Sequence, residues 1–522
     1  MKKQVRTILA LTLGVLLALS ALAGCTTGGA VPAGDGAEAP LKFTMTYSDN
    51  PTLPFREDWL VNTESEARYN LDITWEVIPS TDYTTKINAE LATGTGYDVI
   101  TYLGPSSGDQ AALALSGAMA PISDYVDMGW APNFSRRIEE WNMQAELDER
   151  RLSDGKYYFL PALFDKQFYD GGLILRDDLL EKFGMEAPTT FDELYEYLKA
   201  CKEDNPESFP LTNLVGPQVT YRMSMPSFGM SVGRNASTGT WVLSWNYENK
   251  EYFPGAIDDS YKQYLEYFAK LYAEGLYDPE FLPEGDMWNI KMATGAAVAS
   301  YAYYDQIGGI VAASEVEGIS FNMVPPLEGP GGAYHQPKAR LSAGLVFTAA
   351  AQKRDDFEQL VRAIDNMFYS DEAAELWSLG KEGVTFTRNA DGSVEFIPEA
   401  LESVDGIYKY LQVNYGTGSA SSQFIWINEQ EMLKYDENYA AINAVVAEMD
   451  GVPLSPPTPI LSEENAEQAS LLQAALRDAF EIWNNDFITG AKSLETDWDA
   501  YVQEMKDKGI DELCQIYNDS RR

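Results

Sequence analysis

Short runs of β-branched and aromatic residues alternate with longer, helix-compatible polar stretches along the body of the chain. Three such runs, Lys42–Tyr47, Asp72–Ile78 and Tyr97–Leu103, predict strands, and the third follows Gly94 and Gly96. Their β-α-β-α-β order predicts a parallel sheet whose faces are covered by helices. The pattern therefore favours an α/β fold.

The same alternation continues further along the chain. Gly172–Leu175 predicts a strand, and Asp177–Phe183 predicts a short helix that Gly184 ends. Thr190 and Glu193 have the spacing of a capping box, in which each side chain accepts a hydrogen bond from a backbone N–H near the other residue. Four residues after this box recur at helical spacing and predict a buried face: Phe191, Leu194, Leu198 and Cys201.

The C-terminal third is predicted to be helical. Ser462 is expected to cap a helix that runs through Trp483 to Gly490, and Ser493–Lys508 predicts another helix before Gly509. No internal repeat is present. Two lobes remain possible without a sequential boundary if the backbone crosses between them several times.

The first residues predict an export signal. Lys2, Lys3 and Arg6 precede the apolar stretch Ile8–Leu22, and Leu22-Ala23-Gly24-Cys25 resembles the bacterial lipobox. We expect a signal peptide at 1–24, lipidation of Cys25 and a membrane-anchored protein on the extracytoplasmic face. The alternative is an ordinary secretory signal with Cys25 present by chance.

A Gly-, Ala-, Thr- and Pro-rich segment at 25–40 predicts a flexible tether. From Leu41 onward no run of about 18 apolar residues occurs, so the body is not expected to cross a membrane. Cys201 and Cys514 lie in helix-like segments. A disulfide between them stays open, although buried free thiols fit the pattern better.

Composition excludes several classes of function. The chain has 522 residues, 38 Lys and Arg against 80 Asp and Glu, and a net charge of −42, which disfavours binding to nucleic acid. At about 150 residues per domain this length predicts more than one domain. His335 is the only histidine, so a His-rich metal site is excluded and a catalytic triad would depend on that residue. No cofactor is expected.

Six motifs occur in one order over nearly the whole body of the chain. They are Asp154-Gly155-Lys156-Tyr157-Tyr158-Phe159-Leu160-Pro161, the pair Leu173–Leu180 and Pro188–Leu194, Glu274-Gly275-Leu276-Tyr277-Asp278-Pro279-Glu280-Phe281, Leu341-Ser342-Ala343-Gly344, Gly380-Lys381-Glu382-Gly383, and Asn484-Asn485-Asp486-Phe487-Ile488-Thr489-Gly490. Together they resemble the family 1 extracellular solute-binding proteins of ABC importers, in particular the long lipoproteins that bind alginate and other oligosaccharides.

This resemblance implies a two-lobe, type II periplasmic-binding-protein-like clamp whose lobes are joined by hinge crossovers. Lobe 1 would comprise 41–161 plus about 341–387, and lobe 2 about 162–340 plus 388–522. The implied function is capture of a carbohydrate, in particular an oligosaccharide, between the lobes and its delivery to a membrane permease. No phosphate-binding Gly-x-x-x-x-Gly-Lys-Ser/Thr motif occurs, so a separate subunit would hydrolyse ATP.

The chain departs from its long relatives in one segment. Such proteins often carry a calcium-binding loop after the Pro-Thr-Thr helix, but here Lys202–Pro210 lacks the alternating oxygen ligands. We therefore expect no calcium site in this loop. The acidic surface also disfavours a polyuronate ligand, although a few arginines in the cleft would overcome a distant, screened field.

Candidate ligand-binding residues follow from strand ends and from the resemblance. Asp49 and Asn50 follow the first strand, where ligands of open α/β sheets bind; the alternative is that they cap the next turn. By resemblance, Tyr102, Tyr221, Tyr301, Tyr303, neighbouring Tyr304, and Trp377 are candidates for contact with sugar rings. Core packing is the alternative for each of these aromatic residues.

Three other functions stay open. A surface glycosidase needs two carboxylates about 5 to 9.5 Å apart, and 80 acidic residues leave such a pair possible but uninformative. A peptide-binding transporter component has similar length. A sensor subunit would pass its closed form to a membrane kinase instead of a permease.

Overall fold

The computed structural model describes residues 39–49, 53–94, 96–105, 108–165, 169–214, 217–230, 242–246, 248–281, 287–304, 306–334, 340–403, 406–417, 437–449, 459 and 461–520. The predicted signal peptide, Cys25, the tether up to residue 38, Asn50 and His335 lie outside these ranges. The chain divides into Met1–Pro40 and a compact unit, Leu41–Arg522, that holds every helix and strand described below.

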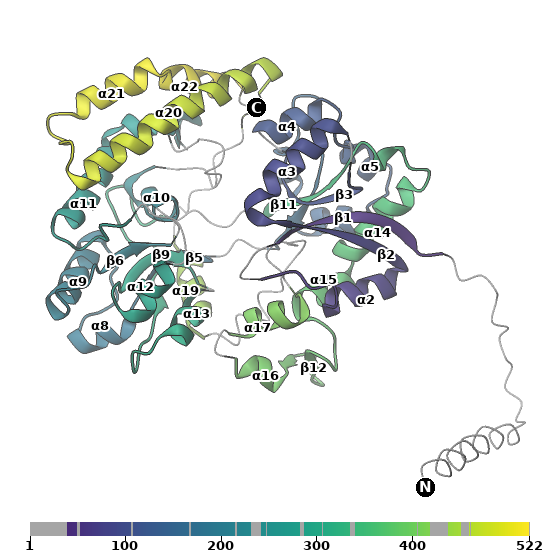
Figure 1. Cartoon of the computed structure of the whole chain (residues 1–522), viewed down its shortest axis with the longest axis horizontal. Coiled ribbons are helices and arrows are strands. Elements are labelled where there is room, and N and C mark those ends of the chain that lie inside the picture. Colours follow the sequence, from purple (N-terminus) through teal and green to yellow (C-terminus); the bar gives the residue numbers. More distant parts are fainter. Residues whose placement is uncertain are drawn as a thin grey trace, which may run out of the picture. The chain divides into compact units, whose positions relative to one another are not determined.

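The strands of this unit form two larger sheets and two hairpins (Figure 1). Their bounds are β1 Leu41–Asp49, β2 Leu71–Pro79, β3 Val99–Leu103, β4 Leu160–Leu163, β5 Gly171–Leu175, β6 Leu211–Asn213, β7 Ser244–Asn246, β8 Glu251–Phe253, β9 Ala299–Tyr303, β10 Asn322–Met323, β11 Leu341–Phe347, β12 Phe386–Arg388 and β13 Val394–Phe396.

Helices account for most of the remaining described chain. Their bounds are α2 Leu60–Tyr69, α3 Ser80–Thr93, α4 Gly108–Leu115, α5 Ile122–Asp127, α6 Pro132–Glu140, α7 Gln144–Asp148, α8 Asp177–Phe183, α9 Phe191–Asp204, α10 Pro217–Ser224, α11 Asp259–Ala273, α12 Met287–Thr294, α13 Gln306–Ala313, α14 Phe357–Tyr369, α15 Asp371–Leu379, α16 Pro398–Leu401, α17 Gly406–Tyr415, α19 Glu437–Ala447, α20 Glu463–Thr489, α21 Trp498–Asp507 and α22 Ile510–Asp519.

The first sheet has five strands in the order β2-β1-β3-β11-β4. Strand β1 pairs in parallel with both β2 and β3, which confirms the predicted β-α-β-α-β unit. Strand β11 comes from far along the chain and runs antiparallel between β3 and β4. The sheet is therefore complete only when a segment near residue 341 joins one that ends at residue 163.

Two irregularities shape this insertion. The pairing of β11 with β3 shifts between Gly344 and Val346, and its pairing with β4 shifts between Ser342 and Gly344. A Cβ on Gly344 would lie 1.9 Å from the carbonyl oxygen of Leu160, so no larger residue fits without moving the neighbouring strand. This close approach explains why the Leu-Ser-Ala-Gly motif has a glycine at position 344.

The second sheet has the order β10-β5-β9-β6, with β6 and β9 parallel and β5 antiparallel to β9. The largest core cluster packs around it and includes Leu194, Leu198 and Cys201, as the helical spacing predicted. The predicted capping box at the start of α9 is confirmed, because Glu193 N donates to Thr190 Oγ1 at 3.1 Å and Thr190 N donates to Glu193 Oε2 at 3.2 Å.

The predicted C-terminal helices are largely confirmed. The Ser462 side chain caps α20 by accepting a hydrogen bond from Asn465 N, and Gly490 ends the helix with φ 77°. The prediction that the next helix begins at Ser493 is wrong, since α21 begins at Trp498. Asp497 accepts a hydrogen bond from Ser493 N at 2.8 Å, which closes a turn before the helix.

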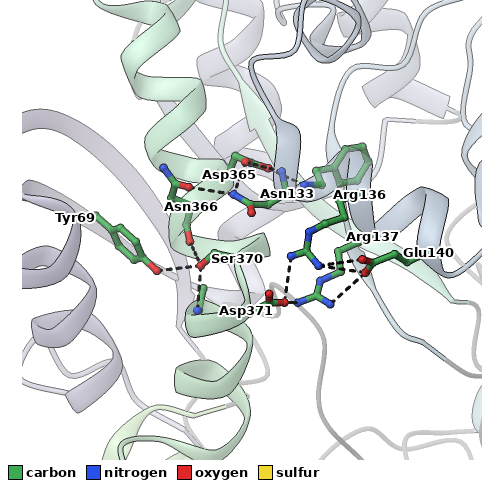
Figure 2. A network of polar contacts seen from close by, with 11 residues as sticks. Tyr69, Asn133, Arg136, Arg137, Glu140, Asp365, Asn366, Ser370 and Asp371 are labelled. Atoms are coloured by element: carbon green, nitrogen blue, oxygen red, sulfur yellow. Dashed lines mark hydrogen bonds and ion pairs between the residues drawn. The ribbon is translucent and has the colours of Figure 1, made fainter.

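A polar network joins α6 to α14 and α15, three helices that pack in the core of the first sheet (Figure 2). Asp365 is 1% exposed and accepts hydrogen bonds from the backbone N–H of Phe134 at 2.8 Å and of Asn133 at 3.0 Å. Burial raises the pKa of Asp365, although these N–H donors oppose the shift. Arg136 and Arg137 both pair with Asp371 at the start of α15.

Two of the chain segments that run between the first and second sheets lie side by side. The segment leaving β4 and the segment entering β11 are joined by a hydrogen bond from Phe164 N to Arg340 O of 2.8 Å. The Arg340 guanidinium donates to both carboxylate oxygens of Glu146, at 2.8 and 2.7 Å, and to the carbonyl oxygen of Trp141 at 3.0 Å. The crossing is therefore fixed to the helices beside the first sheet.

Residues 386–417 form a small cluster of their own around the β12–β13 hairpin, α16 and α17. The Trp59 indole N–H donates to Val413 O at 2.9 Å, and Gly416 lies against the Trp59 ring. Trp59 belongs to the core of the first sheet. This cluster therefore contacts the first sheet, whereas the sequence-based boundary placed residues from 388 onward in the second lobe.

Candidate functional site

The carboxyl end of β3 presents Tyr102 to solvent. Tyr102 has φ 56°, a left-handed conformation that is unfavourable for a residue with a side chain, and its side chain is 45% exposed. Both neighbours, Thr101 and Leu103, are buried. The shifted pairing of β3 with β11 is a bulge, a feature that redirects side chains at functional sites. The backbone strain thus coincides with an exposed aromatic ring.

Asp49 ends β1 in the same sheet and is partly buried. One oxygen of its carboxylate accepts a hydrogen bond from Phe55 N at 2.8 Å, so Asp49 stabilises the following turn. Asn50 lies outside the described residues. The hydrogen bond from Phe55 N supports the alternative role of Asp49 as the cap of this turn. Its role as a ligand contact stays a prediction.

The carboxyl end of β9, in the second sheet, carries Tyr303 and Tyr304, which are both partly exposed. Arg222 of α10 donates from Nη2 to the Tyr303 hydroxyl at 2.6 Å, and its guanidinium carbon lies 5.3 Å from the centre of the Tyr303 ring. Tyr304 stacks on Tyr439 of α19 with ring centres 4.5 Å apart. Polar and aromatic groups therefore gather at this strand end.

Tyr221 and Tyr301 occupy the core of the second sheet, with 4% and 3% exposure. The Asn484 side-chain amide donates to the Tyr221 hydroxyl, and the Tyr261 hydroxyl donates to Asn484. Burial raises the pKa of Tyr221 and of Tyr301 well above the ordinary range. The hydrogen bonds explain the presence of Tyr221 and of Asn484, the first Asn of the Asn-Asn-Asp motif. Burial in the same core explains Tyr301.

Trp377 lies in the core of the first sheet with 3% exposure. Its indole N–H donates to Met367 O at 3.0 Å, and its ring packs on Phe368 with centres 5.2 Å apart. Core packing, the alternative stated for Trp377, matches this environment. We therefore leave Trp377, Tyr221 and Tyr301 out of the site proposed below.

Sequence reasoning did not single out Arg222. It lies 81 residues from Tyr303, and its own segment offers no motif that links the two. Tyr439 was missed for the same reason, since α19 reaches Tyr304 from more than a hundred residues away. Only an unusual lack of acidic residues around Arg222, from Val215 to Gly233, was available as a signal in the sequence.

The remaining chemistry of the described residues is sparse. Cys201 and Cys514 are both buried, and burial raises the pKa of the Cys201 thiol to about 12. Within the described ranges, no three His, Cys, Asp or Glu side chains group closely enough to hold a metal ion. Among the described helices, none combines the length and apolar character needed to cross a membrane.

Comparison with known proteins gives the family. The model of bacterial extracellular solute-binding proteins matches residues 60–375, more than half of the chain. Lipoprotein LipO of Bacillus subtilis is 24% identical over 67% of this chain and 68% of its own. The fructooligosaccharide ABC transporter substrate-binding protein FusA of Streptococcus pneumoniae is 23% identical over 91% of this chain and 89% of its own.

A solved structure shares the fold. The alginate-binding protein AlgQ2 without calcium ion superposes with a TM-score of 0.75 at 17% identity, covering 92% of this chain and 98% of that protein. The two-lobe α/β fold implied by the six motifs is therefore confirmed. With its matched region spanning both sheets, the chain belongs to the family of bacterial extracellular solute-binding proteins.

Proposed function

We propose that this protein captures a carbohydrate, in particular an oligosaccharide, and delivers it to the permease of an ABC importer. Two of the similar proteins have names that give carbohydrate ligands, a fructooligosaccharide for FusA and alginate for AlgQ2. The permease and a separate ATPase subunit belong to the same proposal.

The observation that carries the proposal is Tyr102. A partly exposed aromatic ring on a strained backbone, at a bulge near the carboxyl end of a parallel strand, is costly for folding and well suited to stack on the apolar face of a sugar ring. Tyr303 and Tyr304 at the carboxyl end of β9 supply the same chemistry from the second sheet. We propose these three tyrosines, with Asp49, as the ligand-binding set.

We further propose that the two sheets define the two lobes. Lobe 1 would contain 41–161 and 341–387, extended to residue 417 because α17 bonds to Trp59. Lobe 2 would contain the rest of 162–522. The ligand would favour the closed arrangement only to the extent that it binds that arrangement more tightly than the open one. The paired segments at Phe164 and Arg340 would act as the hinge.

Tyr102→Ala should weaken oligosaccharide binding by about 10-fold, because one aromatic contact contributes about 0.5–1.5 kcal/mol beyond burial. The melting temperature of the unliganded protein should fall only slightly, since Tyr102 is already 45% exposed. Isothermal titration with the best ligand from a melting-shift screen of oligosaccharides measures the affinity.

Val77→Ala is the matched control, because Val77 lies in the same sheet and is 42% exposed. It should alter neither affinity nor melting. An unchanged affinity for Tyr102→Ala would remove Tyr102 from the site. Cleavage of the bound oligosaccharide by the wild-type protein during prolonged incubation would instead favour a glycosidase.

We also propose that Cys25 carries the lipid anchor and that residues 1–24 are removed on export. The Leu-Ala-Gly-Cys motif supports this proposal, as does the name of the similar Lipoprotein LipO. In cells fed radiolabelled palmitate, Cys25→Ala should lose the label and either stay unprocessed or appear in the medium. Cys201→Ala is the control, and a label that survives Cys25→Ala would overturn the assignment.

A further inference from the structure

Most arginines in the described part of this acidic chain form ion pairs with carboxylates. Ten of the described arginines form ion pairs with Asp or Glu: Arg56, Arg68, Arg136, Arg137, Arg151, Arg176, Arg340, Arg354, Arg362 and Arg388. With 80 acidic residues against 38 basic ones, an arginine without a carboxylate is unexpected. Such an arginine therefore needs a specific explanation.

Three described arginines lack such a pair: Arg150, Arg222 and Arg477. Arg477 is exposed on α20, where water solvates its charge. Arg150 lies in the turn after α7, and no hydrogen bond fixes its guanidinium among the described contacts. Arg150 and Arg222 are both partly buried, but Arg222 differs because a hydrogen bond to Tyr303, at the end of β9, holds its guanidinium in one position.

The position of Arg222 suits a ligand contact. Its Nη2 donates to the Tyr303 hydroxyl at 2.6 Å and its plane lies near the Tyr303 ring. A guanidinium has five N–H donors, and the Tyr303 hydroxyl is the one acceptor that it contacts in the described part of the chain. The other donors stay available at the carboxyl end of β9, the end where ligands of such sheets bind.

We propose that Arg222 binds a carboxylate of the ligand, so that the natural ligand is an acidic oligosaccharide containing uronic acid residues. This inference rests on the proposed carbohydrate-binding function. A guanidinium matches the two oxygens of a carboxylate with paired hydrogen bonds, and the neighbouring aromatic ring limits the motion of the arginine before the ligand arrives. The net charge of −42 does not prevent this, since salt screens distant charges over about 8–10 Å while the contact with Arg222 is direct.

The test uses the purified full-length mature chain and titration calorimetry with three probes. The probes are trigalacturonate, a mannuronate trisaccharide and the neutral trisaccharide kestose. The wild type should bind at least one of the two acidic probes, and Arg222→Gln should weaken that binding about 10- to 100-fold. Arg477→Gln, which removes a charge of the same kind on an exposed helix face, should leave it unchanged.

Tyr303→Phe provides a second variant that keeps the ring and removes the acceptor of the Arg222 hydrogen bond. It should weaken the acidic probe by a smaller factor than Arg222→Gln and leave melting nearly unchanged, which distinguishes lost positioning from lost folding. If Arg222→Gln fails to fold, the Tyr303→Phe result decides: unaltered affinity for the acidic probe overturns the inference.

The outcomes separate this inference from the proposed function. Binding of kestose alone, or acidic binding that Arg222→Gln does not alter, overturns the inference and leaves carbohydrate capture standing. Binding of none of the three probes overturns the acidic ligand, and binding of none in a wider oligosaccharide panel overturns the proposed function as well.

Discussion

Gly344→Ala should destabilise the protein by about 3 kcal/mol or more, the largest effect that we expect from a single methyl group. The added Cβ would lie 1.9 Å from the carbonyl oxygen of Leu160 and 2.7 Å from the Cα of Pro161. Both atoms belong to the backbone of β4, which cannot rotate away as a side chain would. Either β11 or β4 must move, and the pairing that closes the five-stranded sheet is lost.

Urea unfolding followed by circular dichroism measures this change. Gly309→Ala is the matched control, since a Cβ on Gly309 meets no atom within 4 Å and Gly309 lies inside α13. That substitution should be neutral or stabilise the protein by up to about 1 kcal/mol, because alanine favours helices. Equal stabilities of the two variants would contradict the close approach of β11 and β4.

Asp365→Ala should cost about 2–4 kcal/mol, because it leaves the buried backbone N–H of Phe134 and the partly buried one of Asn133 without an acceptor (Figure 2). These groups start α6, so the loss should loosen that helix from α14. Asn366→Ala is the control within the same network. It removes one exposed hydrogen bond to the Asn133 side chain and should cost less than about 1 kcal/mol.

Asp365→Asn tests the ionisation of the same group. Burial raises the pKa of Asp365, so the folded state holds its proton at a pH where the unfolded state has lost it. Its stabilising contribution is therefore complete below the ordinary carboxyl pKa and declines as the pH rises through the raised value. The stability of the wild type relative to Asp365→Asn should fall as the pH rises above about 4, the ordinary carboxyl pKa. An advantage that grows over this range would mean that the carboxylate is the favoured folded form.

Local signals made much of the fold predictable from the sequence. Strand β1, helix α8 and the capping box at Thr190 depend on residues close to one another in the chain, so composition and spacing were enough. The insertion of β11 between β3 and β4 was not predictable in this way, because partners such as Gly344 and Leu103 are distant in sequence. The resemblance to a family led us to expect that segment in the first lobe, but it did not indicate its place in the sheet.

The candidate site was predictable only in part, for a similar reason. A predicted strand end and the resemblance pointed to Tyr102, and the resemblance alone pointed to Tyr303. It pointed equally to Tyr301, which lies two residues before Tyr303 on the same strand and is buried. The difference comes from α10 and neighbouring helices, which cover the middle of the sheet and leave its end accessible, and no local pattern records it. Arg222 belongs to one of those covering helices, so only the folded contact with Tyr303 reveals it.

The central placement of β11 also bears on biosynthesis. A ribosome makes residues 41–163 long before residue 347, so four strands of the first sheet leave the tunnel with an empty position between β3 and β4. Until β11 is made, no strand links β3 to β4, and the five-stranded sheet stays incomplete. A nascent chain with this topology delays its own tertiary structure, which is compatible with the export proposed above.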